Sequence, residues 1–77
     1  MDTMIWVARL ETRCFQFEGV GRTEDEARGV VREAWKRHVL SFPPMAQASM
    51  YTFAELEEDV VVEWRIIGVP YRDGEEI

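Results

Sequence analysis

The chain has 77 residues, enough for a single domain over residues 1–77, and its hydrophobic content of 47% excludes a disordered protein. Fifteen acidic residues against nine basic ones give a formal net charge of −6, and residues 41–77 hold eight of the acids but only two of the bases. Such a negative field repels phosphate backbones and anionic membranes, so net charge does not favour nucleic-acid binding.

Two strands are predicted near the N-terminus. Residues 4–10 are rich in β-branched and aromatic side chains, and residues 14–20 resume that pattern with Phe15 and Phe17 alternating against polar neighbours. Only residues 11–13 separate the two runs. A β-hairpin is the simplest connection between them.

A helix is predicted from Thr23 to Leu40. Thr23 and Glu26 have capping-box spacing, in which the hydroxyl accepts the amide of Glu26 and the carboxylate reaches back to the amide of Thr23. The helix must end before Pro43-Pro44. Within this helix, one apolar stripe has helical spacing, and His38 prolongs it near the end. The stripe consists of Ala27, Val30, Val31, Ala34 and Trp35.

The second half predicts a loop, a helical turn and a strand. Residues 41–52 are low in charge and are expected to form a connecting loop, and a second capping-box spacing from Thr52 predicts a helical turn over Phe53–Glu58. Residues 60–67 predict the strongest strand. Beyond it, Asp73-Gly74 predicts a turn, and we expect residues 71–77 to be an acidic, frayed tail.

These elements predict an α+β fold in the order β-β-α-(short helix)-β. One main helix packed on a three- to four-stranded, mainly antiparallel sheet buries both the helix stripe and one sheet face in two layers. We expect Trp6, Trp35 and Trp64 to share that core, with Trp64 on the same face of its strand as Val60 and Val62.

The junction between the second strand and the helix reads Gly19-Val20-Gly21-Arg22-Thr23. A dinucleotide fingerprint needs a third glycine where Glu24 stands, and a P-loop needs a Gly-Lys-Ser/Thr ending. Neither is present. We therefore expect Gly19 and Gly21 to provide a tight turn and close packing of strand against helix.

The same junction, continued to Ala27, resembles the last strand-to-helix junction of double-stranded-RNA-binding domains. In that family the helix opens with lysines that grip phosphates, whereas Glu24 and Asp25 stand at the matching positions here. It also resembles the small β-rich domain of type II antitoxins of the HicB kind, whose proline-glycine-cysteine loop this chain lacks. Each resemblance covers one supersecondary unit and implies no functional residue.

The sequence predicts a non-enzymatic protein without catalytic, cofactor-binding or metal-binding residues. Cys14 is the only cysteine of the chain and His38 its only histidine. Their spacing suggests no third group that would orient them as a nucleophilic pair. No apolar run approaches the roughly 18–20 residues that span a bilayer, and residues 1–4 lack the basic start of a signal peptide. We therefore expect a soluble cytoplasmic protein that has no membrane or cofactor partner.

Partner binding is expected from the middle of the chain. Aromatic and methionine side chains that are hard to bury together commonly mark protein–protein contacts, and clustered acids can mimic a phosphate array. The sequence predicts an accessory or regulatory protein that binds an unidentified protein, with a homodimer and an acidic decoy of phage or plasmid origin as variants of this hypothesis. The alternative is nucleic-acid binding through a basic helix stripe of Arg28, Arg32 and Lys36. The predicted partner-binding residues are Phe42, Met45, Met50, Tyr51, Phe53, Glu55, Glu57, Glu58 and Asp59.

Overall fold

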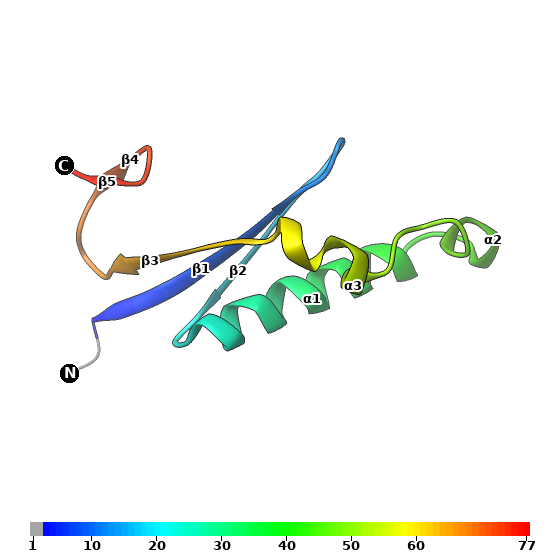
Figure 1. The fold of residues 1–77 in the computed structure, drawn as a ribbon, viewed down its shortest axis with the longest axis horizontal. Helices are drawn as coiled ribbons and strands as arrows, with labels where there is room; N and C mark the ends of the chain where they lie inside the picture. The colour runs from blue at the N-terminus through cyan, green and yellow to red at the C-terminus, as the bar shows by residue number, and fades with distance from the viewer. Residues whose placement is uncertain (1–2) are drawn as a thin grey trace.

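The computed structural model describes residues 3–77, and its central element is a three-stranded antiparallel sheet (Figure 1). Strands β1 (Met4–Glu11), β2 (Gln16–Gly21) and β3 (Val61–Ile66) lie in the order β2-β1-β3. β1 and β2 form the predicted hairpin. The second strand begins later than predicted, because hydrogen bonds between Thr12 and Phe15 close a loop over residues 12–15. The Thr12 amide and hydroxyl both donate to the Phe15 carbonyl oxygen, and the Phe15 amide donates to the Thr12 hydroxyl.

The main helix, α1 (Glu24–Leu40), has the predicted bounds. The Thr23 hydroxyl accepts the Glu26 amide at 3.1 Å, as the spacing predicts. The reciprocal half of the capping box is different, since the Glu26 carboxylate accepts the amide of Arg22 at 3.4 Å. Three acids in the first turn, residues 24–26, place negative charge at the positive end of the helix dipole.

The core lies between α1 and one face of the sheet. Its fully buried side chains include Leu10 from β1 and Val31 from α1, and burying one such side chain contributes about 1.5–3 kcal/mol. Trp35 is buried as predicted. The prediction for Val30 was wrong, because this residue lies beside Gly19 at the β2 edge and is 41% exposed.

The segment after α1 is more regular than the predicted loop. It contains the short helix α2 (Pro44–Gln47), with Pro44 in its first turn, where the missing amide costs nothing. The predicted helical turn is present as α3 (Phe53–Leu56), continued by a 3₁₀ turn, η1 (Glu57–Asp59). Thr52 and Glu55 form the complete capping box that their spacing predicts.

The acidic tail is a small hairpin, so its prediction as a frayed segment was wrong. Strands β4 (Tyr71–Arg72) and β5 (Glu75–Glu76) pair as a separate two-stranded sheet. The turn is at the predicted residues, with φ of 53° at Asp73 and 84° at Gly74, as a type I′ hairpin requires. Figure 1 shows this hairpin beside β3, at the opposite end of the molecule from α2.

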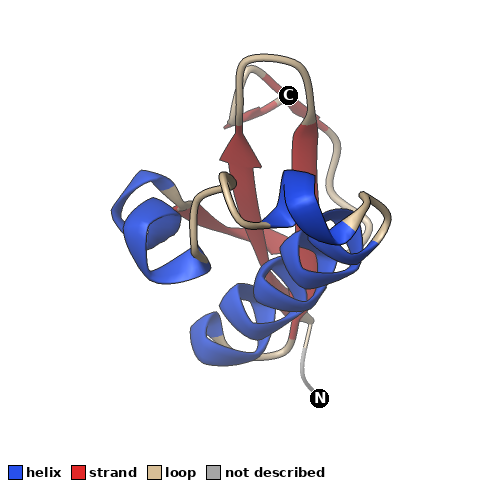
Figure 2. Cartoon of the chain, turned by 90° about the vertical axis from the view of Figure 1, so that its right-hand side faces the viewer, coloured by secondary structure: helices blue, strands red, loops and turns tan. Residues whose placement is uncertain are grey.

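The architecture is therefore the predicted two-layer α+β fold, which Figure 2 views along its length from the α2 end. Besides Val30, a second residue predicted for the core lies exposed. Trp64 is 51% exposed, because α1 lies against β1 and β2 and leaves the inner face of β3 partly uncovered. Over residues 3–77, no helix combines the length and apolar character needed to cross a bilayer.

Candidate protein-interaction surface

The predicted apolar residues divide into two groups. Met50 and Phe53 are half-buried and pack against the core, so they serve the fold first. Met45 on α2 and Tyr51 before α3 are 91% and 65% exposed. Phe42 belongs to the exposed group at 37%, although the centroid of its ring lies 5.0 Å from that of the His38 imidazole.

A shallow groove of about 380 Å³ lies between the second half of α1 and the segment that leads into α3. Its lining is mainly apolar and includes Trp35, Val39, Met50, Tyr51 and Phe53, together with the charged residues Arg32 and Lys36. We refer to it as the Tyr51 groove. A groove with apolar walls and a few charged side chains at its margin suits an amphipathic peptide segment.

The backbone at Tyr51 is held in place, although the Tyr51 side chain is exposed. The indole Nε1 of Trp35 donates a hydrogen bond to the carbonyl oxygen of Tyr51 at 3.1 Å. Trp35 is itself buried in the core. The Tyr51 ring is thus presented to solvent from an ordered position, which lowers the entropy cost of using it in a contact.

The acidic residues that were predicted as partner-binding adjoin this groove. All four carboxylates lie exposed on α3 and η1. Two of them have internal roles, since Glu55 closes the capping box and Glu57 lies 3.8 Å from the guanidinium of Arg32. We refer to Glu55, Glu57, Glu58 and Asp59 as the acidic segment.

The basic stripe of α1 is largely neutralised by neighbouring acids. Within the stripe, Arg28 pairs with Glu24 at 3.4 Å and Arg32 pairs with Glu57 of the acidic segment. Beside the stripe, Arg37 pairs with Glu33 at 3.3 Å. The ring of Phe53 also lies 5.4 Å from the Arg32 guanidinium carbon. A phosphate backbone would have to displace these carboxylates from the stripe.

His38 lies in an aromatic cluster rather than beside a nucleophile. The rings of Phe15, Phe17, Trp35 and Phe42 surround it at centroid distances of 4.8 to 5.3 Å. This packing holds the end of α1 against the β1–β2 hairpin. Cys14 is exposed in the loop of that hairpin.

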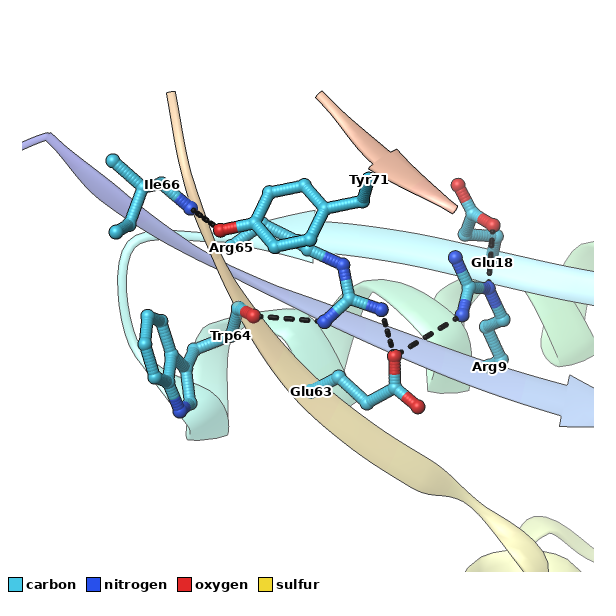
Figure 3. Close-up of polar contacts among 7 residues, drawn as sticks. All are labelled: Arg9, Glu18, Glu63, Trp64, Arg65, Ile66 and Tyr71. Atoms are coloured by element: carbon cyan, nitrogen blue, oxygen red, sulfur yellow. Dashed lines mark hydrogen bonds and ion pairs between the residues drawn. The ribbon is translucent and has the colours of Figure 1, made fainter. Parts of the chain in front are cut away.

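The outer face of the sheet carries a ladder of charged side chains across all three strands (Figure 3). The Arg9 guanidinium on β1 lies 3.0 Å from Glu18 on β2 and 3.5 Å from Glu63 on β3, and Glu63 also binds Arg65. The Tyr71 ring then stacks 4.9 Å from the Arg65 guanidinium carbon. These groups satisfy one another, so the ladder is explained as a structural feature.

The free edge of β3 is capped by side chains of the same region. The Tyr71 hydroxyl accepts the Ile66 amide at 2.9 Å, and Arg65 donates to the Trp64 carbonyl at 2.8 Å. Unpaired edge groups are a template for uncontrolled strand pairing, and these two contacts remove part of that template. The contact of Tyr71 could not be predicted from the sequence, because nothing in the local pattern links Tyr71 to β3.

Within residues 3–77, no three side chains of His, Cys, Asp or Glu gather closely enough to hold a metal ion. No family model, no curated protein and no solved structure matches this chain. The likeness of its Gly19–Ala27 junction to double-stranded-RNA-binding domains and to HicB-type antitoxins therefore remains a local one.

Proposed function

We propose that this protein is a small, non-enzymatic accessory or regulatory module that binds a protein partner through the Tyr51 groove and the acidic segment. The observation that carries the proposal is the exposed Tyr51 ring on a backbone fixed by Trp35. Tyrosine is among the residues that most often dominate binding energy in protein interfaces. Met45, on the adjacent α2, adds an adaptable apolar side chain.

The charge of the region supports a partner with basic side chains. Glu58 and Asp59 are exposed in η1, which continues α3, and the first residue of α3, Phe53, lines the groove. The chain as a whole carries a net charge of −6. The partner that fits is a segment with an apolar anchor for the groove and arginine or lysine side chains for the acidic segment, since opposite charges steer association and fix orientation.

Selection from a random peptide library displayed on phage, with the full chain as bait, tests this chemistry. Selected peptides should combine an apolar residue with two or more basic residues. Tyr51→Ala should weaken their binding by about tenfold or more, as for a residue at the centre of an interface. The double variant Glu58→Gln/Asp59→Asn should weaken binding at low salt and reduce its salt dependence.

The matched control is Val20→Thr, which alters an exposed apolar residue on β2, away from the groove. Its affinity for the selected peptides should equal that of the unmodified protein. Selection of peptides without basic residues, or equal binding to the Tyr51→Ala variant, would reject the proposal. Nucleic-acid binding is not proposed, because three of the four basic residues on α1 already pair with acids.

A further inference from the structure

The isolated chain has more surface than a compact monomer of its mass. Its accessible surface is 5968 Å² at 9.0 kDa, whereas the general scaling for folded monomers gives about 4,850 Å². The radius of gyration is 14.4 Å, against about 11.5 Å for a compact domain of this length. About 1,100 Å² of surface is therefore in excess, comparable to the ~800 Å² that each partner buries in a standard interface.

An apolar patch lies where the helix layer does not reach. Two cross-strand pairs, Trp6 with Trp64 and Met4 with Ile66, share the inner face of the sheet with the core residue Ala8. Met4 is 39% exposed and Trp64 is 51% exposed. Figure 3 shows the Trp64 ring pointing away from the charged ladder on the outer face. We refer to these four residues, Met4, Trp6, Trp64 and Ile66, as the tryptophan face.

We propose that the protein forms a homodimer in which the tryptophan faces of two copies pack against each other. The surface excess of one chain is as large as the area that each copy buries in a standard interface, so a dimer contact of that size can account for it. The four side chains carry no charge, so two chains of net charge −6 can meet there without burying like charges against each other. A two-fold contact is self-complementary, and each Trp64 would pack on the tryptophan face of the other copy.

The capped edge of β3 determines how the copies meet. Tyr71 occupies the Ile66 amide and Arg65 occupies the Trp64 carbonyl, so these groups do not offer hydrogen bonds to a strand from a second chain. The contact is therefore between faces and not between strand edges. A contact between faces closes at two copies, whereas open strand edges propagate into larger assemblies.

Sedimentation velocity and light scattering over a range of micromolar concentrations test the dimer. The unmodified protein should shift from 9.0 kDa towards twice that mass as concentration rises, and its melting temperature should rise with concentration. Trp64→Thr keeps a β-favouring residue but removes the indole. It should raise the dissociation constant of the dimer by about 30-fold or more.

Two further variants keep the result interpretable. Met4→Thr alters the edge of the same face at the start of β1, and it should also weaken the dimer. If Trp64→Thr fails to fold, the dissociation constant of Met4→Thr tests the proposal in its place. Met45→Thr is the matched control, because Met45 is 91% exposed on α2 at the other end of the molecule. It should leave the dissociation constant unchanged.

A mass of 9.0 kDa at every concentration would overturn the proposal, and so would a dimer that persists unchanged in both Trp64→Thr and Met4→Thr. A dimer lost in the Met45→Thr control would place the interface elsewhere and would equally overturn it. The outcome is independent of peptide binding at the Tyr51 groove. A monomeric Trp64→Thr variant that still binds the selected peptides would separate the two surfaces.

Discussion

Gly19 and Gly21 are the positions at which β2 comes closest to α1. A Cβ atom built on Gly19 would lie 2.8 Å from the carbonyl oxygen of Ala27, and one on Gly21 would lie 2.5 Å from the amide nitrogen of the same residue. Both neighbouring atoms belong to the helix backbone, which cannot move without shifting the whole helix. Close approach, rather than phosphate binding, accounts for the two glycines.

Replacing either glycine by alanine should therefore destabilise the fold. We expect Gly19→Ala and Gly21→Ala each to lower the free energy of unfolding by about 1–3 kcal/mol, as overpacking commonly does. Urea titration followed by circular dichroism measures this change. The control is Gly29→Ala within α1, where an added Cβ meets nothing within 4 Å and should stabilise the helix by about 0.5–1 kcal/mol. Unchanged stability in both strand variants would contradict the packing argument.

The packing role of these glycines was predictable from the sequence, whereas the environment of Trp64 was not. The two glycines fall at a strand-to-helix junction, where a missing Cβ has a direct physical use. Trp64 alternates correctly with Val62, and that pattern establishes which face of the strand it shares. Whether anything covers that face depends on how far α1 extends across the sheet, and the local sequence pattern does not predict this.

At the scale of elements, α1 could be predicted with correct bounds because independent signals agree on it. The Thr23 cap, the first-turn acids, the apolar stripe and the Pro43-Pro44 stop all indicate the same segment. The short helix α2 was missed because four residues hold too little periodicity to identify it. The turn of the β4–β5 hairpin was predicted from Asp73-Gly74, but its strands were not, because two residues in each strand hold too little pattern to identify them.

The contact between Tyr71 and Ile66 is expected to protect the edge of β3. Tyr71→Phe keeps the ring that stacks on Arg65 but removes the oxygen that accepts the Ile66 amide. A hydrogen bond of this kind contributes about 1 kcal/mol net, so exchange of the Ile66 amide should accelerate by roughly fivefold to tenfold. Hydrogen exchange followed by nuclear magnetic resonance measures the rate.

The Ile67 amide is the internal reference, since it donates to the Thr3 carbonyl across the β1 side and should keep its exchange rate. Tyr51→Phe is the control for loss of a tyrosine hydroxyl elsewhere. Equal acceleration at Ile66 and Ile67 would indicate general loosening of the strand. In that case the Tyr71 hydroxyl would not be the specific cap described here.

At the scale of the whole molecule, the elongated shape separates the two proposed binding surfaces. The molecule measures 46 × 24 × 20 Å, so it is long for its mass, and its ends carry different surfaces. The Tyr51 groove is lined by the second half of α1 and the segment between α2 and α3, and the tryptophan face lies where β1 begins and β3 ends. Figure 1 shows α2 and these strand ends at opposite ends of the molecule. An elongated module of this kind can bind a second copy at one end and another protein at the other.

The net charge of −6 should make the stability of each chain depend on salt. The ion pairs are at the surface and contribute about 0–1 kcal/mol each, so screening them costs little. Repulsion among the excess acids opposes the folded state, and salt weakens it. We expect the free energy of unfolding to rise by about 1 kcal/mol between low and moderate sodium chloride, which corresponds to about 4–8 °C in melting temperature at this size.

Screening within one chain has to be separated from screening between two chains of a dimer, so the melts are best recorded in the Trp64→Thr variant. In that background, the added change Glu58→Gln/Asp59→Asn removes two exposed charges from the acidic segment. It should raise the melting temperature at low salt and reduce the further gain on adding salt, because less repulsion remains to be screened. A melting temperature that falls steadily with salt would contradict this expectation, because it would mean that the surface ion pairs stabilise the chain by more than the repulsion destabilises it.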